Sequence, residues 1–252
     1  MGFLLSLLKF AKLAPILKSA AFMLLSIGAY ALLYGWKFAV GFVLLILVHE
    51  TGHLVAARRL GMQAGLPMFI PFVGAWIELK DVPLSVEQEA NIAFAGPLAG
   101  TLGACAVLAV ALQERSGLLM ALAYSGFFIN LFNLIPIAPF DGGRIVAILS
   151  PKVWFLGLPL LLVAWYYVRS PMFIVILVLL APTIWASLQA AWHGTVPEHN
   201  PRYYDVPMEA RVRYASYYIL LLLFLCVMTF KTHEQVEAAR LASAAVAMVR
   251  PA

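Results

Sequence analysis

The sequence has few charged residues: they make up only 12% of its 252 residues, whereas hydrophobic residues make up 63%. The mean hydropathy is +0.92. Soluble globular domains are typically about 25% charged and about 45–50% apolar. A soluble globular protein is therefore excluded, and the composition indicates a polytopic membrane protein. The length allows several spans of about 20 residues each and leaves little for a soluble domain.

Cysteine is scarce, and the basic residues form no cluster. Cys105 and Cys226 lie in apolar segments without the spacing of a metal site. This excludes a disulfide framework and indicates small buried hydrophobic residues. The formal net charge is +5, but the lysines and arginines are scattered along the chain, so no nucleic-acid partner is expected. Their distribution is better explained by membrane topology, with the lipid bilayer as the partner.

Hydropathy predicts an all-α polytopic membrane protein with about six to seven transmembrane helices. The expected spans are residues 17–34, 36–57, 90–112, 118–135, 153–192 with a break at 169–171, and 214–230. We expect residues 1–252 to form a single domain. Its expected parts are an interfacial segment at 1–16, a core at 17–144, further helices at 145–230 with a cytoplasmic loop at 193–213, and an amphipathic tail at 231–252.

The loops predict an orientation. With a cytoplasmic N-terminus, 11 of the 17 lysines and arginines fall on the inside and 6 on the outside. This distribution satisfies the positive-inside rule. The ends of the second and fourth spans would then lie near the cytoplasmic leaflet.

The connection between the second and third spans is unusual. Residues 65–80, GLPMFIPFVGAWIELK, are too apolar for a solvated loop and too rich in glycine and proline for a helix. Residues 75–80 alternate as a strand does. Because non-helical backbone at membrane depth needs protein or a wet cavity around it, we expect a short membrane-associated β-hairpin that dips toward a cavity. A loop lying on the lipid headgroups is the alternative.

Ionisable residues follow an apolar run in LLILVHETGHLVAARR, residues 44–59. His49 and His53 are four residues apart, so on a helix they share one face and can bind one metal ion. Glu50 is angled away and can hold a metal-bound water. An ionisable residue within a span costs roughly 2.5–3.5 kcal/mol and by default marks a functional site. In a chain with only five histidines, a chance match or a pair of ordinary core histidines is the weaker interpretation.

Aspartate is also scarce, with only three in the chain. Asp81 and Asp205 lie in polar loops, where solvated charges are expected. Asp141 instead follows an apolar helix and two prolines in NLIPIAPFDGGR, residues 133–144. The prolines should unwind the span and let Asp141 point into the protein at the depth of the histidines; a helix-capping aspartate is the alternative. Imidazole and carboxylate suit zinc, and a catalytic zinc takes three protein ligands and a water.

The two motifs together resemble those of the site-2 protease family of intramembrane zinc metalloproteases. The similarity rests on HETGH in one span and on Asn-x-x-Pro-x-x-Pro-x-Asp-Gly at the end of another. It covers roughly Gly41 to Arg144, including AGPLAG at 95–100, and is loose from Val153 onward. The resemblance is to a compact form, without the PDZ or CBS domain that many relatives carry.

The resemblance implies roles for five residues. His49, His53 and Asp141 would bind Zn²⁺, one ion per chain, and Glu50 would be the catalytic base. Asn133 would lie near the scissile peptide bond. Residues 17–144 would then be the catalytic core of a single transmembrane metalloprotease domain.

Further candidates carry less support. Ala75, Trp76 and Ile77 are candidate substrate-binding residues, because an extended substrate could pair with a strand edge there. Asn130 matches no role in the family, and we expect it to make hydrogen bonds in helix packing. The loop at 193–213 is expected to be an interfacial basic and aromatic anchor; a substrate gate or a partner surface is the alternative.

The resemblance implies hydrolysis of peptide bonds within or near transmembrane segments of membrane-anchored substrates. This would serve regulated intramembrane proteolysis or the clearance of remnant signal peptides. The partners would be a transmembrane protein or peptide, the bilayer and, where selection needs one, a regulatory membrane partner; the sequence does not set the oligomeric state. The expected location is a prokaryotic inner membrane, with the active site near the cytoplasmic side. The alternatives are a metal transporter and a catalytically inactive membrane scaffold.

Overall fold

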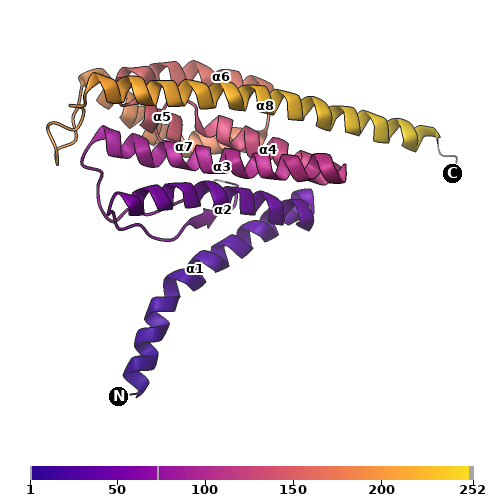
Figure 1. Cartoon of the computed structure of the whole chain (residues 1–252), viewed down its shortest axis with the longest axis horizontal. Coiled ribbons are helices and arrows are strands. Elements are labelled where there is room, and N and C mark those ends of the chain that lie inside the picture. Colours follow the sequence, from indigo (N-terminus) through magenta and orange to yellow (C-terminus); the bar gives the residue numbers. More distant parts are fainter. Residues whose placement is uncertain (1, 73, 250–252) are drawn as a thin grey trace.

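A computed structural model describes residues 2–72 and 74–249, and it is helical apart from one small sheet (Figure 1). The helices are α1 (Gly2–Tyr34), α2 (Trp36–Arg59), α3 (Val86–Glu114), α4 (Gly117–Asn133), α5 (Asp141–Val146), α6 (Gly157–Val168), α7 (Pro171–His193) and α8 (Met208–Val249), with a 3₁₀ helix η1 (Pro151–Leu156) and strands β1 (Met68–Ile70) and β2 (Gly74–Trp76). The predicted fold class is confirmed. Residue 1 and residues 250–252 of the expected terminal segments lie outside the described residues.

Five of the described helices are long and apolar enough to cross a membrane, judged by length and composition. They correspond to Leu13–Tyr34, Trp36–Arg59, Val86–Glu114, Phe173–His193 and Met208–Ala242. Two shorter apolar helical stretches, Gly117–Asn133 and Pro151–Tyr166, match the remaining predicted spans. Residues 2–16 are helical and continuous with the rest of α1, and their expected place at the interface stays a prediction.

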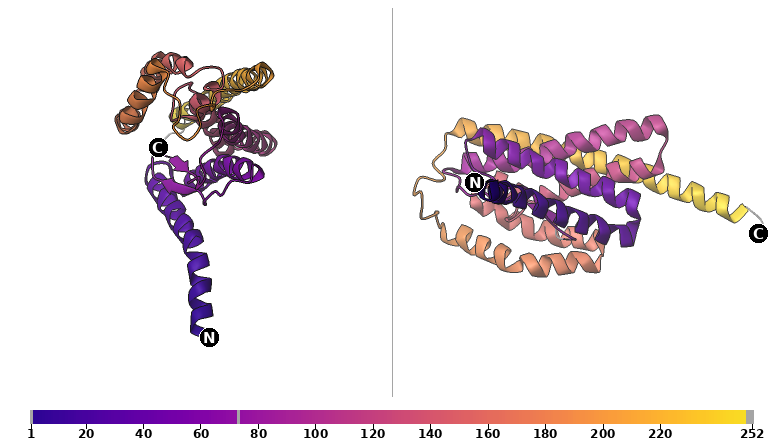
Figure 2. Two further views of the ribbon diagram at one scale, coloured as in Figure 1. Left: turned by 90° about the vertical axis from the view of Figure 1, so that its left-hand side faces the viewer. Right: turned by 90° about the horizontal axis from the view of Figure 1, so that it is seen from below.

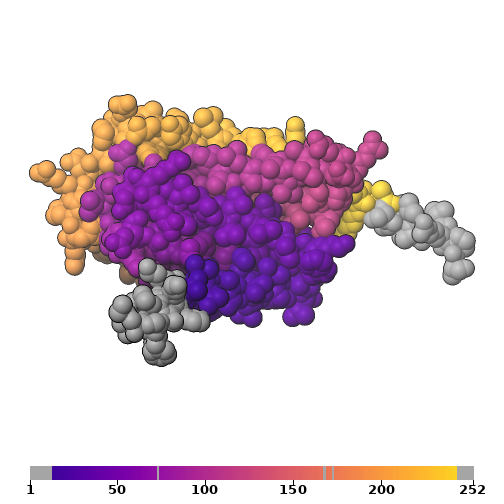
Figure 3. All heavy atoms as spheres, turned by 60° about the horizontal axis from the view of Figure 1, so that its bottom comes forward, coloured from indigo at the N-terminus to yellow at the C-terminus, as the bar shows by residue number. Residues whose placement is uncertain are grey.

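The helices α2, α3, α4 and α8 run side by side, while α6 and α7 form a second group (Figures 1 and 2). The C-terminal part of α1 packs on this bundle, and the ribbon of its N-terminal part points away from it (Figure 2). Figure 3 shows one face of the molecule, where atoms of α2, α3 and α4 form a continuous surface. The close contact of α2 with α3 and of α3 with α4 places the two sequence motifs on neighbouring elements.

The hairpin predicted between the second and third spans is present. β1 and β2 pair antiparallel, with Phe69 opposite Ala75. The second strand is shorter than the alternating residues 75–80 suggested: it begins at Gly74 and ends at Trp76, so Ile77 lies just beyond it. A single bridge between Ala64 and Leu79 then continues the pairing at the base of the hairpin.

The break between α4 and α5 places the second motif. α4 ends at Asn133, and the two prolines downstream prevent the helix from continuing to Asp141. Carbonyls freed in this way need partners at membrane depth. The Tyr218 hydroxyl of α8 donates to the Leu134 carbonyl, just after the end of α4, at 2.7 Å. Within α5, the Trp154 indole N–H donates to the Gly143 carbonyl at 2.8 Å, which also accepts from the Ala147 N–H.

The expected amphipathic tail, residues 231–252, is helical as far as the structure describes it, because residues 231–249 continue α8 without a break. The reason is local: α8 contains neither proline nor glycine, so no residue stops the helix. The C-terminal end of α8 extends beyond the other helices (Figure 1).

Candidate metal centre

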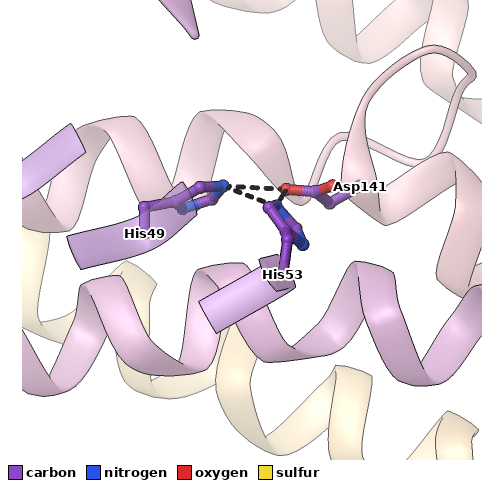
Figure 4. A group of neighbouring side chains, drawn as sticks. All are labelled: His49, His53 and Asp141. Carbon is purple, nitrogen blue, oxygen red and sulfur yellow. Dashed lines mark hydrogen bonds and ion pairs between the residues drawn. The ribbon is translucent and has the colours of Figure 1, made fainter. Parts of the chain in front are cut away.

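Three predicted ligands meet between α2 and α5 (Figure 4). His49, His53 and Asp141 are only 5%, 8% and 7% exposed. The His49 Nε2 and His53 Nε2 atoms are 3.0 Å apart, and they lie 3.1 and 3.3 Å from Oδ2 of Asp141. The two histidines are one turn apart on α2, and the unwound segment after α4 brings the carboxylate to them.

The hydrogen bonds on the other side of each ring fix which nitrogen carries the proton. His53 Nδ1 lies 2.7 Å from the Ile92 carbonyl oxygen, which can only accept, so Nδ1 must donate. The Asn130 amide nitrogen donates to the Gly126 carbonyl at 2.7 Å, which turns its Oδ1 toward His49 Nδ1 at 2.8 Å. His49 Nδ1 therefore donates as well. In the neutral imidazoles both Nε2 atoms are left as lone-pair acceptors.

Three acceptor atoms thus converge in a buried space. Two imidazole lone pairs and a carboxylate oxygen at 3.0 to 3.3 Å repel one another unless a cation lies among them. An ion with tetrahedral bonds of about 2.0–2.1 Å holds its ligand atoms roughly 3.3 Å apart. The donor set and its spacing therefore fit a small divalent metal such as zinc.

Glu50 lies next to this group without joining it. Its side chain is 6% exposed, and it makes no hydrogen bond or ion pair with another residue that the structure describes. A buried carboxylate without a protein partner is costly unless water or a cation is near. Such a group beside a metal position can accept a proton from a bound water.

Small residues of α3 make room for the site. A Cβ atom at Gly96 would overlap the His53 ring, and one at Gly100 would overlap the Asn130 side chain. A Cβ at Gly52 would overlap the Ala95 carbonyl, so this glycine allows α2 and α3 to approach closely. The AGPLAG stretch, noted in the sequence for its resemblance alone, is therefore the surface against which His53 and Asn130 pack.

The start of α3 is also fixed by its sequence. The Ser85 hydroxyl caps the helix by accepting from the Gln88 N–H at 3.3 Å, and the Gln88 side chain accepts from the Leu84 N–H at 2.9 Å. This is close to a capping box, which stabilises a helix N-terminus. Ile92, whose carbonyl orients His53, follows two turns later.

The other candidates lie apart from this group. Asn133 is half-buried at the last position of α4 and is not among the convergent residues. Asp81 accepts from the Gln63 N–H at 2.6 Å in an exposed loop, as expected of a solvated charge. Ala75 and Trp76 lie on β2, which packs against α2.

Asn130 makes a hydrogen bond between helices, as expected, but its particular partner was not anticipated. The structure places its side-chain oxygen on His49 and leaves the residue only 1% exposed. Two features of the sequence could have identified it: a polar amide within an apolar span, and a position one turn before Asn133. Ligands of this kind are usually oriented by such a hydrogen bond.

The fold and the site define a class: a helical membrane protein with a buried metal-ligand group and an adjacent buried carboxylate. Residues 37–117 match the model of Peptidase family M50. The matched residues include His49, Glu50 and His53 and end before Asp141, which the structure places beside them. The resemblance to the site-2 protease family is therefore confirmed.

Individual relatives show the same resemblance. The zinc metalloprotease MJ0392 of Methanocaldococcus jannaschii is 34% identical over 127 residues, covering 47% of this chain and 37% of that protein. A Mycobacterium tuberculosis protein named "Putative zinc metalloprotease Rip3" is 30% identical over 138 residues, covering 48% of this chain and 34% of that protein. The chain thus spans little more than a third of the length of these relatives.

Among solved structures, the site-2 protease from Methanocaldococcus jannaschii aligns with a TM-score of 0.45 at 22% identity. The alignment covers 70% of this chain and 88% of that one.

Substitutions of the two asparagines of α4 should have different effects on zinc affinity. Asn130→Ala removes the acceptor that orients His49, so we expect zinc affinity to fall by about 10–100-fold. Asn133→Ala is the matched control, because it shortens the same kind of side chain on the same helix outside the convergent group. It should leave zinc affinity within about 2-fold of wild type. Competition with a chelator measures both, and equal affinities for the two variants would contradict the assignment of Asn130.

Proposed function

We propose that this chain is a zinc-dependent intramembrane metalloprotease that hydrolyses peptide bonds within or near transmembrane segments of membrane-anchored substrates. The observation that carries the proposal is the convergence of His49 Nε2, His53 Nε2 and Asp141 Oδ2, with the buried Glu50 next to His49 in the sequence. Relatives named zinc metalloproteases and the Peptidase family M50 match support it.

The three ligands would hold one zinc ion per chain. When bound, zinc supplies a water whose pKa is lowered toward about 7 and a Lewis acid for a peptide carbonyl. Asp141 contributes the negative charge that partly neutralises the ion, and the two Nδ1–H donors keep both rings in the ligating tautomer. Three protein ligands leave a position for water, as a catalytic site requires.

The remaining steps belong to side chains around the ligands. The Glu50 carboxylate accepts the proton of the attacking water and passes it to the leaving amine. The Asn133 amide donates a hydrogen bond to the substrate backbone or to the oxygen that gains charge during attack. Its position at the end of α4, where the chain unwinds toward Asp141, supports this role.

A transmembrane substrate must expose a peptide bond before it can be cut. Its carbonyls are committed to helical hydrogen bonds, so a local stretch must unwind and find other partners. In the proposed function, Ala75, Trp76 and Ile77 offer the edge of the hairpin to such an extended stretch. Trp76 is 51% exposed, which leaves this part of the hairpin accessible.

The proposal also includes the location of the protein in a membrane. The apolar helices and the family resemblance support an integral membrane protein. The positive-inside distribution supports a site near the cytoplasmic side of a prokaryotic inner membrane. The substrate would be a membrane-anchored protein or peptide, with a regulatory partner supplying selection where one is needed.

Replacing Glu50 by Gln tests the proposal. Loss of the general base should lower the rate of cleavage of a membrane-anchored substrate by about 10²–10⁴-fold. Zinc content should be retained, because Glu50 is not one of the ligands. Glu114→Gln, at the exposed far end of α3, is the control and should cleave at the wild-type rate.

The same pair of variants separates the rival functions. If the protein were a metal transporter, Glu50→Gln would keep its metal flux. If it were an inactive scaffold, Glu50→Gln would keep its full function. Comparing the membrane proteomes of cells with the wild type and with Glu50→Gln would show which proteins are cut. Unchanged proteomes together with unchanged cleavage in the purified variant would overturn the protease proposal.

Ile77→Pro tests the role of the hairpin. Proline removes a backbone N–H next to the strand edge, so a substrate loses about one hydrogen bond there. We expect kcat/KM to fall by roughly 2- to 10-fold while zinc remains bound. Val82→Pro, in the exposed loop beyond the hairpin, is the control. Equal cleavage by Ile77→Pro and the wild type would argue against substrate pairing at this edge.

A further inference from the structure

The carboxylate of Asp141 has two different environments. Oδ2 faces the two histidines, whereas Oδ1 lies 3.8 Å from Nη1 of Arg144, one turn further along α5. Only one oxygen of this ligand is therefore directed at the metal position. The orientation of the carboxylate depends on what holds the guanidinium.

Arg144 is held from outside its own helix. Its Nε donates to Oε1 of Glu89 at 3.1 Å, in the first turn of α3. The Tyr203 hydroxyl donates to the other oxygen of the same carboxylate. Burial, and then the nearby Glu89 carboxylate, raise the pKa of Tyr203, so its hydroxyl is a donor at neutral pH. A continuous polar chain thus runs from Tyr203 through Glu89 and Arg144 to the ligand.

Tyr203 lies in the connection between α7 and α8, residues 194–207. Hydrogen bonds join this connection to the start of α3 and the residues just before it. The Val86 N–H donates to the Tyr203 carbonyl at 3.0 Å, and the Asn200 amide donates to the Leu84 carbonyl at 2.5 Å. His199 Nε2 is 3.2 Å from the Pro83 carbonyl. Tyr203 itself is only 4% exposed. The connection therefore presents its tyrosine at a fixed place beside Glu89.

We propose that Arg144, Glu89 and Tyr203 are positioning residues that aim Asp141 at the metal, so that the 194–207 connection sets the metal affinity of the site. The inference rests on the proposed function only in requiring that His49, His53 and Asp141 hold zinc. It gives the polar residues of this connection a purpose beyond anchoring at a membrane surface.

Substitution of Arg144 distinguishes positioning from simple electrostatics. A guanidinium beside a divalent ion repels it, so Coulomb's law alone predicts tighter zinc binding in Arg144→Gln. Positioning predicts the opposite, a loss of about 10–100-fold in zinc affinity, as is typical when the partner of a ligand is removed. Arg144→Lys keeps the charge but not the planar fork, and its affinity should fall between those of Arg144→Gln and the wild type.

A matched pair of glutamates in the first turn of α3 supplies the control. Glu89 pairs with Arg144, which contacts Asp141, whereas Glu87 pairs with Arg213 of α8 at 2.5 Å. Among the described residues, this second pair makes no contact with a metal ligand. Glu89→Gln and Glu87→Gln each remove one negative charge from the same helical turn. Zinc affinity should fall about 10-fold or more in the first and stay within about 2-fold of wild type in the second.

The experiment uses the full chain in detergent or bilayers, with zinc affinity measured by competition with a chelator and the visible spectrum recorded after loading with Co²⁺. The Co²⁺ spectrum reports ligand geometry, which a general loss of stability would not change in a folded sample. Tyr203→Phe removes a single hydroxyl, and it should weaken zinc binding in the same direction even if Arg144→Gln does not fold. Thermal unfolding midpoints of all variants identify any that are only destabilised.

The outcomes separate this inference from the proposed function. If Arg144→Gln binds zinc as tightly as the wild type or tighter, or if Glu89→Gln and Glu87→Gln behave alike, positioning by this chain of residues is wrong. The protease proposal then stands unaffected. If the wild type binds no zinc through His49 and His53, the proposed function itself fails.

Discussion

The rest of the structure depends on one constraint: three atoms with lone pairs meet in a buried space and need a cation between them. His49 and His53 turn their Nε2 atoms toward Oδ2 of Asp141 because both Nδ1–H groups are committed to acceptors elsewhere. Without a cation, this buried arrangement leaves lone pairs facing one another at about hydrogen-bond distance. With one, every polar atom of the three ligands has a partner. The surrounding fold serves to keep that arrangement intact.

The fold does so in two ways. Helices pack closely around the ligands, and the helical chain is interrupted between α4 and α5. Gly96 and Gly100 of α3 leave space that the His53 ring and the Asn130 side chain fill. Small residues allow this kind of approach between helices in a membrane. The prolines after α4 end the helix, and the Tyr218 hydroxyl of α8 satisfies the Leu134 carbonyl in that stretch. Asp141 can therefore reach the histidines from a different element at the same depth.

Much of this could be predicted from the sequence, because it depends on local patterns. Apolar runs predicted the membrane spans. The four-residue spacing predicted that His49 and His53 lie on the same face of a helix, and the prolines predicted that Asp141 points into the protein. The hairpin was expected, but its strand ends at Trp76 rather than reaching further, because strand ends depend on pairing. The sequence did not show whether the tail joins the last span; the absence of glycine and proline from α8 explains why the two are continuous. The partners of the ligands could not be predicted: Asn130 and His49, or Glu89, Arg144 and Tyr203, are far apart in the sequence, and only helix packing brings them together.

The most direct test of the central claim is X-ray absorption at the zinc edge on the purified protein, compared with Asp141→Ala. The wild type should contain one zinc ion per chain, with two nitrogen ligands from imidazole and oxygen ligands at about 2.0–2.2 Å. In Asp141→Ala one of the oxygen ligands should be lost, and zinc should bind more weakly. A wild-type protein without zinc, or a spectrum that Asp141→Ala leaves unchanged, would contradict a metal held jointly by α2 and α5.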